Sequence, residues 1–313
     1  MMQPLALGID IGGTNTSFGL VDDKGNIFMK GNMPTVGHEN IHAYISSLKT
    51  ELQPFFDEVG KLNIKGVGIG APNGNFFTGE IVFAPNLPWK GIVPLAKMIN
   101  DALDIKTMLT NDANAAAVGE MMYGAAKGMK DFIIVTLGTG LGSGFVANGQ
   151  VIYGHDSFAG ELGHVIAVRE GRKCGCGRNG CLETYASATG IVRTAELWLK
   201  ERNVETVLRP EMGHIRSTRI FNAAKQGDAF ALEIFEYTGK VLGQALADAV
   251  AITSPEAIVF FGGLANAGEL LFGPVRRHME DNLLHIFKDK VLLIQSKLPD
   301  ADAAILGASA LAW

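Results

Sequence analysis

The three cysteines of the chain lie within eight residues of one another, and this cluster constrains the fold more than any other stretch. They follow the pattern Cys-x-Cys-x4-Cys at Cys174, Cys176 and Cys181, and His164 lies ten residues upstream. Three thiolates and one imidazole form the closed four-ligand set that structural zinc takes. The glycines between them allow the tight turns that a loop needs to wrap around one ion. The spacing therefore predicts a structural zinc site.

Other interpretations of the cysteines remain open. Free cysteines often pack as small apolar core residues, but this run is polar and rich in glycine. A disulfide would leave one cysteine over, and nothing in the sequence indicates secretion. Carboxylates flank the cluster at Glu161 and Glu183, so we expect the loop to form the wall of a binding site.

Composition excludes several classes of protein. The chain of 313 residues suits one large domain or two ordinary ones, and its net charge of −5 gives no basic surface for nucleic acid. The N-terminal residues lack the basic region of a signal peptide. No apolar run approaches the ~20 residues of a membrane span. We expect a soluble cytoplasmic protein with neither nucleic-acid nor membrane partners.

A strand, a glycine turn and a second strand occur twice. The first copy has strands at 5–9 and 17–21 around a turn at 11–16, and the second has strands at 132–137 and 145–147 around a turn at 138–144. The shared order predicts a duplicated fold with a ligand between its halves. Backbone N–H groups of such turns can hold phosphate. Neither turn matches a P-loop or a Rossmann motif, and glycine is also the ordinary residue of a structural hairpin.

The remaining periodicity indicates strands that alternate with helices, which is an α/β architecture. Helices are predicted at 40–59, 93–103, 113–123, 184–200, 228–253, 267–285 and 303–311, and further strands at 27–30, 65–70, 81–83, 106–110, 150–153, 257–261 and 291–294.

Two polar residues, Asn111 and Asp112, lie between a predicted strand and the helix that follows it. Ligands of open α/β sheets bind at such strand ends. Alternatively, Asp112 only caps the helix. Gly262 and Gly263 follow another strand, where glycine lets a flat ligand approach the backbone.

In this order, the motifs resemble those of the ROK family (repressor, open reading frame, kinase) of sugar kinases, within the hexokinase–actin superfamily. The resemblance covers residues 7–311. It rests on Asp10-Ile-Gly-Gly-Thr14 and Leu137–Gly144 as phosphate motifs, Glu161-Leu-Gly-His164 as the sugar motif, Cys174–Glu183 as the zinc motif, and Phe261-Gly-Gly263 as the adenosine motif.

The resemblance implies a duplicated actin/hexokinase-like (ribonuclease H-like) α/β fold, with two lobes that close over sugar and ATP. The small lobe would comprise residues 1–111 with the C-terminal helix at 301–313, and the large lobe residues 112–300 with the zinc loop. Because family members are often dimers or tetramers, a homodimer or homotetramer is expected.

The implied activity is ATP-dependent phosphorylation of a hexose, with ATP, Mg²⁺ and structural Zn²⁺ as cofactors. The glucokinase members, which act in glycolysis, are the most similar, although kinases for N-acetylglucosamine, N-acetylmannosamine, mannose, fructose and allose share the frame. The segment at 71–75 departs from the family's glycine- and proline-rich form. A non-catalytic sugar-sensing regulator is the alternative, but only nine residues precede Asp10, too few for the DNA-binding segment of the family's repressors.

The same resemblance implies a role for each motif residue. Asp112 would be the catalytic base, Asp10 would hold Mg²⁺, and His164 would bind both zinc and sugar. The phosphates and adenosine would contact Gly12, Gly13, Thr14, Gly138, Thr139, Gly140, Gly262 and Gly263. The sugar would contact Gly74, Asn86, Asn111, Asp112, Glu161, His164 and Glu183, and zinc would contact His164, Cys174, Cys176 and Cys181.

Overall fold

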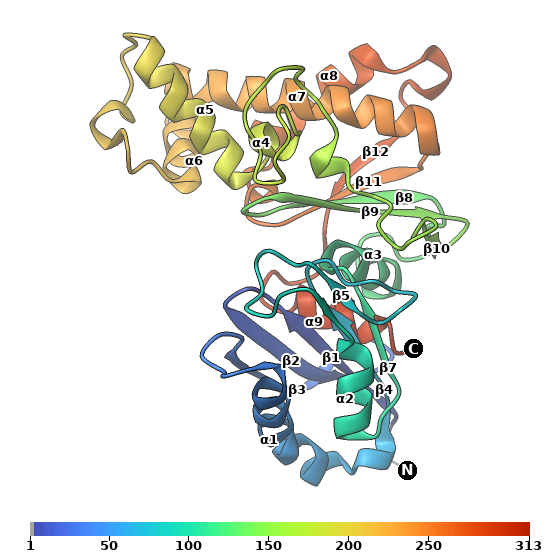
Figure 1. The fold of residues 1–313 in the computed structure, drawn as a ribbon. Coiled ribbons are helices and arrows are strands. Elements are labelled where there is room, and N and C mark those ends of the chain that lie inside the picture. Colours follow the sequence, from blue (N-terminus) through green and yellow to red (C-terminus); the bar gives the residue numbers. More distant parts are fainter. Residues whose placement is uncertain (1–2) are drawn as a thin grey trace. The chain divides into compact units, whose positions relative to one another are not determined.

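A computed structural model describes residues 3–313, so Met1 and Met2 of the predicted small lobe lie outside the described residues. The chain forms two compact α/β units (Figure 1). The N-terminal unit contains the described residues up to 130 together with 144–160 and 296–313, and the central unit contains 131–143 and 161–295. None of the helices within residues 3–313 is long and apolar enough to cross a membrane.

The sheet of the N-terminal unit has three parallel strands beside an antiparallel pair. Its order is β3 (Ile27–Pro34), β2 (Asn15–Val21), β1 (Leu5–Ile11), β4 (Ile64–Gly70) and β7 (Thr107–Thr110). β1 pairs with β2 and β2 with β3 in antiparallel fashion, whereas β1, β4 and β7 run parallel. The carboxyl ends of β1, β4 and β7 therefore meet at one edge.

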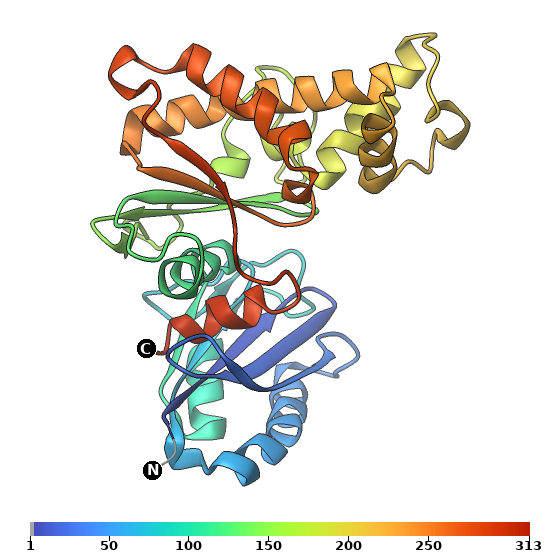
Figure 2. The same ribbon diagram turned by 180° about the vertical axis from the view of Figure 1, so that it is seen from behind.

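Helices cover both faces of this sheet. They are α1 (Ile41–Val59), α2 (Leu95–Leu103), α3 (Asp112–Tyr123) and α9 (Ala303–Ala310), and a short pair, β5 (Ile81–Val82) and β6 (Ile92–Val93), lies among the loops. Successive strand residues face opposite sides, so Leu7 and Ile9 of β1 join the core with Leu48 of α1. Gly8 faces α9, and a Cβ there would lie 2.2 Å from the Ile305 carbonyl oxygen. Figure 2 shows α9 against the strands.

The family resemblance implied a small lobe of residues 1–111 with 301–313 and a large lobe of residues 112–300. The two compact units of the structure have other boundaries. Because α3 packs on α9 and β4, it groups with the N-terminal unit.

The second sheet repeats the order of the first. It runs β10 (Gln150–Val151), β9 (Leu141–Ala147), β8 (Phe132–Leu137), β11 (Ala257–Phe261) and β12 (Leu292–Gln295). β8, β11 and β12 are parallel, as are β1, β4 and β7 of the first sheet. In both sheets the strand that comes first along the chain lies in the centre. The next two strands of the chain lie on one side of it, and the two later parallel strands lie on the other. This repeat is the duplicated design expected from the sequence.

The helices of the central unit are α4 (Glu183–Ala186), α5 (Ala188–Glu201), α6 (Ser217–Lys225), α7 (Ala229–Thr253) and α8 (Glu269–Asn282). The long helices α7 and α8 pack side by side (Figure 1).

Three predicted boundaries in this part of the chain were wrong. The helix predicted at 184–200 is two helices, because the side chain of Ser187 accepts a hydrogen bond from the Gly190 N–H and starts α5 there. The turn predicted at 138–144 ends at residue 140, since β9 begins at Leu141. The helix predicted at 267–285 begins only after Gly268, whose φ is +57°.

Candidate functional site

Two carboxylates flank the carboxyl edge of the first sheet. Asp10 of β1 lies opposite Gly70 of β4, and Gly70 lies opposite Thr110 of β7. A Cβ on Gly70 would be 3.6 Å from Oδ1 of Asp10 and 3.8 Å from Cα of Asp112. Asp10 and Asp112 therefore stand on either side of the end of β4.

The electrostatics of this pair favour a cation. Burial raises the pKa of Asp10 to about 7, and the negative charge of Asp112 adds to the effect. Asp112 is an exposed residue by surface area, but the protein around its carboxyl group displaces water from it. This desolvation raises the pKa of Asp112. Two repelling carboxylates are oxygen ligands of the kind Mg²⁺ takes, so these residues fit the ion.

The start of α3 separates the roles of Asn111 and Asp112. Asn111 is the N-cap, and its Oδ1 accepts a hydrogen bond of 2.9 Å from the Asn114 N–H. Asp112 is the first residue of the helix, and its Oδ1 accepts from the adjacent Ala113 N–H at 2.8 Å. The interpretation of Asp112 as the helix cap was therefore wrong, and capping does not account for this carboxylate.

The first glycine turn joins β1 to β2 and lies against two other segments. The Thr35 N–H donates to the Thr14 carbonyl at 2.8 Å. A Cβ on Gly13 would lie only 2.7 Å from the Asn86 carbonyl oxygen, so this position accepts glycine alone. Gly13 and Asn86 are therefore neighbours, and the side chains of Thr14 and Asn86 are exposed.

Gly74 has a packing role in the same unit. It is buried, and a Cβ there would be 2.4 Å from the carbonyl oxygen of Thr110, the residue before Asn111.

The second glycine turn, residues 138–140, joins β8 to β9. Its Gly138 carbonyl accepts from the Ala188 N–H at 2.9 Å, and its Thr139 carbonyl accepts from the Thr189 hydroxyl at 2.7 Å. The first residues of α5 thus hold the turn. Gly262 has a φ of +99°, and a Cβ there would be 2.8 Å from the Leu137 carbonyl oxygen. Gly262 and Gly263 therefore lie beside the turn, at the ends of β11 and β8.

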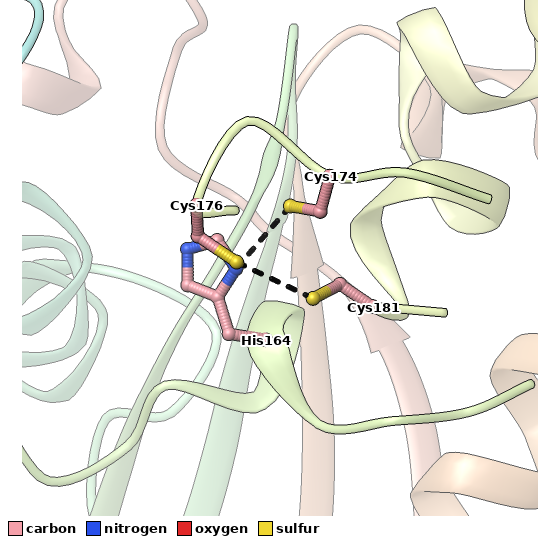
Figure 3. Close-up of side chains that lie close together, drawn as sticks. All are labelled: His164, Cys174, Cys176 and Cys181. Atoms are coloured by element: carbon pink, nitrogen blue, oxygen red, sulfur yellow. Dashed lines mark hydrogen bonds between the residues drawn. The ribbon is translucent and has the colours of Figure 1, made fainter. Parts of the chain in front are cut away.

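The four predicted zinc ligands point toward one another (Figure 3). Their ligand atoms all lie within 4.8 Å of one another. The Sγ atoms of Cys176 and Cys181 are 3.6 Å apart, and Sγ of Cys174 is 3.8 Å from Nδ1 of His164. A tetrahedral shell with Zn–S bonds of about 2.3 Å places sulfur atoms about 3.8 Å apart. The cluster fits a structural zinc ion.

The loop that carries these cysteines folds back on itself. The Cys174 N–H donates to the Arg178 carbonyl at 2.8 Å, and the Arg178 guanidinium donates to the His164 carbonyl at 2.7 Å. A backbone hydrogen bond from Arg178 lowers the pKa of Cys176 to about 6, whereas burial raises that of Cys174 to about 12. A bound cation would replace the proton on Cys174 and favour the thiolate.

Glu183 connects the metal cluster with the second glycine turn. Its Oε1 accepts from the Cys174 thiol at 2.9 Å and lies 3.8 Å from Nδ1 of His164. Its Oε2 lies 2.8 Å from the position that a Cβ on Gly140 would take. Glu161 begins the short 3₁₀ turn that ends at His164. These predicted residues of the central unit thus lie close together.

The sequence analysis did not identify two residues, Ser143 and Arg178, whose hydrogen bonds hold the turn that carries His164. Ser143 of β9 accepts a hydrogen bond from the Leu162 N–H at 3.1 Å and so holds the 3₁₀ turn on the sheet. Arg178 holds the His164 backbone. A positive charge inside a cysteine-rich loop was the available signal for Arg178, whereas Ser143 gave none.

Comparisons with known proteins cover nearly the whole chain. The ROK family model matches residues 6–313. A glucokinase of Thermotoga maritima is 36% identical over 313 residues, which is 97% of this chain and 96% of its own. An N-acetylmannosamine kinase of Citrobacter koseri is 30% identical over 312 residues, 98% of each chain.

The fold is also that of a solved relative. A ROK family glucokinase from Streptomyces griseus, in complex with glucose and AMPPNP, matches with a TM-score of 0.80 at 31% identity over 98% of each chain. This likeness confirms the actin/hexokinase-like fold expected from the sequence. Since the family model spans both glycine turns, the sugar motif and the cysteine loop, the chain belongs to the ROK family.

Proposed function

We propose that the protein is an ATP-dependent hexose kinase that phosphorylates the 6-hydroxyl of D-glucose. The observation that carries the proposal is the pair of carboxylates, Asp10 and Asp112, at the shared edge of three parallel strands. Phosphoryl transfer needs a group to accept the proton of the attacking hydroxyl and a place for the cation that accompanies ATP. The relatives named glucokinase, at 35–36% identity, favour glucose as the acceptor.

Asp112 is the proposed base. It takes the proton of the sugar hydroxyl as that oxygen bonds to the γ-phosphorus of ATP, while the bond from this phosphorus to the β–γ bridging oxygen breaks and ADP leaves. The raised pKa of Asp112 suits this role, because a base works best with a pKa near the operating pH. Asn111, not Asp112, is the N-cap of α3, and Oδ1 of Asp112 accepts a hydrogen bond from the Ala113 N–H.

In this proposal the two glycine turns and the glycines after β11 supply the nucleotide contacts. The phosphates contact Gly12, Gly13, Thr14, Gly138, Thr139 and Gly140, and adenosine contacts Gly262 and Gly263. The exposed hydroxyl of Thr14 and the open surface around Gly138 and Gly263 leave room for a ligand. Asp10 holds Mg²⁺, which when bound neutralises phosphate charge.

The sugar contacts are assigned to Gly74, Asn86, Asn111, Glu161, His164 and Glu183. Amides and carboxylates suit a polyol, since each sugar hydroxyl both donates and accepts. In His164, Nδ1 faces the cysteines, which leaves Nε2 for a sugar hydroxyl. The metal loop would then fix the direction of one sugar contact.

The test is kcat/KM for glucose, mannose, fructose, allose, N-acetylglucosamine and N-acetylmannosamine, measured side by side with ATP. Glucose is expected to lead clearly, because a site built on hydrogen bonds rejects analogues that leave its groups unpaired, by up to ~10⁴. If another sugar exceeds glucose, the glucokinase assignment is wrong while the sugar-kinase assignment stands. N-acetylmannosamine is the second candidate, on the evidence of the 30% identical relative.

A non-catalytic sugar sensor is the rival from another class. It predicts sugar binding without ATP turnover at any concentration of sugar, and the same assay separates the two. We also propose a homodimer or homotetramer, which light scattering coupled to size-exclusion chromatography would measure.

A further inference from the structure

Three buried hydroxyls form a chain beneath the first glycine turn. The hydroxyl oxygens of Thr16 and Thr35 are 2.9 Å apart, and Thr16 Oγ1 is 2.8 Å from the hydroxyl oxygen of Tyr44. All three residues have 0% exposure. No part of the chemistry proposed above uses them. A buried hydroxyl that makes no hydrogen bond costs free energy, and these three hydroxyls avoid that cost by bonding to one another.

The two threonines of this hydroxyl chain contact one side of the turn through their backbone. Thr16 lies in β2, two residues after Thr14. Thr35 follows the end of β3, and its N–H donates to the Thr14 carbonyl at 2.8 Å. The bond between the two threonine hydroxyls therefore fixes the residue that holds the end of the turn.

Tyr44, at the other end of the hydroxyl chain, supports the opposite side of the glycine turn. The ring of Tyr44 packs on Trp89, with 4.6 Å between ring centroids. Trp89 is buried in the loop that contains Asn86, whose carbonyl lies against Gly13. One hydrogen-bonded chain thus contacts both segments that enclose the turn.

The turn has little support of its own. Gly12 and Gly13 carry no side chains, and the side chains of Thr14 and Asn15 are exposed. Its only internal hydrogen bond among the described residues runs from the Gly12 N–H to the Asn15 carbonyl at 2.9 Å. The direction of its N–H groups consequently depends on the neighbouring segments.

We propose that Thr16, Thr35 and Tyr44 are positioning residues that hold the turn at residues 12–14 in the conformation that binds the phosphates of the nucleotide. This inference rests on the proposed function of the turn. Loss of one hydroxyl leaves its buried partner unpaired, and the segment must shift to restore a hydrogen bond. Because a phosphate site depends on fixed N–H directions, nucleotide affinity falls before sugar affinity does.

The experiment removes hydroxyls without changing shape. Thr16→Val and Tyr44→Phe each delete one hydroxyl, and Thr16→Ser keeps it. The matched control is Thr238→Val in α7, because Thr238 is also buried and its hydroxyl has no hydrogen-bond partner in the described part of the chain. KM for ATP, KM for glucose and kcat are measured, together with AMPPNP affinity by calorimetry.

Thr16→Val and Tyr44→Phe are expected to raise KM for ATP and weaken AMPPNP binding by roughly tenfold, the usual effect of unpairing a buried hydrogen bond. KM for glucose should stay near the wild-type value, Thr16→Ser should restore ATP affinity, and Thr238→Val should change neither constant. The double variant should lose less than the product of the single losses, since both substitutions break one chain.

The outcomes distinguish this inference from the proposed function. If the wild type phosphorylates no sugar with ATP, the proposed function fails, and AMPPNP affinity still tests the inference. If the variants melt at lower temperature but bind AMPPNP as the wild type does, the hydroxyl chain serves stability alone and the inference is overturned. An equal change in both KM values overturns it as well. Tyr44→Phe decides the matter should Thr16→Val not fold.

Discussion

At the scale of single residues, Asp112 offers the sharpest test of the chemistry. Asn111 caps α3, so Asp112→Asn removes a carboxylate without removing the cap. We expect turnover to fall by about 10²–10⁴-fold, the usual loss for a general base. KM for glucose and the melting temperature should change little. Steady-state kinetics check this, with Asp57→Asn on the exposed surface of α1 as the control. A variant that keeps most of its turnover would show that the base lies elsewhere.

Residue identities near the site were predictable where the signal was local. The change from strand to helix at Asn111 and Asp112 is visible in a few adjacent residues, and so is the cysteine spacing. The hydroxyl chain was not predictable, because Thr16 lies 19 residues from Thr35 and 28 from Tyr44. Those partners meet only once β2, β3 and α1 have packed, and no local pattern encodes that packing.

At the scale of an element, the last turn of α3 contains a buried carboxylate. Glu120 has 0% exposure, and it accepts hydrogen bonds from the Ala125 N–H at 2.6 Å and from the Ser296 hydroxyl. The sequence predicted the helix at 113–123, but not this role, because Ser296 lies 176 residues away. Glu120 ties the end of α3 to the segment that leads into α9.

This carboxylate makes stability depend on pH. Burial raises the pKa of Glu120 above its ordinary value of 4.5. The folded chain therefore keeps a proton that the unfolded chain releases above pH 4.5, and the free energy of unfolding falls as pH rises beyond that value. Glu120→Gln carries no charge at any pH and can still accept from Ala125 and donate to Ser296.

We expect the stability of Glu120→Gln, relative to the wild type, to increase as pH rises above 4.5 and to level off once pH exceeds the raised pKa of Glu120. Urea unfolding at several pH values measures this difference. Glu58→Gln, on the exposed face of α1, is the control for loss of one carboxylate. A difference that stays constant with pH would mean that Glu120 has no raised pKa.

At the scale of the whole molecule, the two units have separate cores. The strands β1 and β4 are buried with α1 and α2 in one. In the other, β8 and β11 are buried side by side, α7 packs on α8, and Phe260 of β11 contacts Phe272 of α8. The cysteine loop belongs to the central unit, where Ser143 of β9 and the start of α5 hold its surroundings. Loss of the metal should consequently loosen one unit and leave the other intact.

Cys176→Ser tests this directly, because Cys176 is exposed and its replacement leaves no cavity in the core. Losing one thiolate opens the four-ligand shell, so bound zinc should fall from one per chain toward none. Amides of residues 161–186 should then exchange hydrogen faster, while those of β1 and β4 keep their protection. Metal analysis and hydrogen-exchange mass spectrometry measure both effects, and wild-type protein stripped by a chelator should give the same exchange map. Full zinc occupancy in the variant would exclude Cys176 as a ligand, and equal loosening of β1 would show that the two cores unfold together.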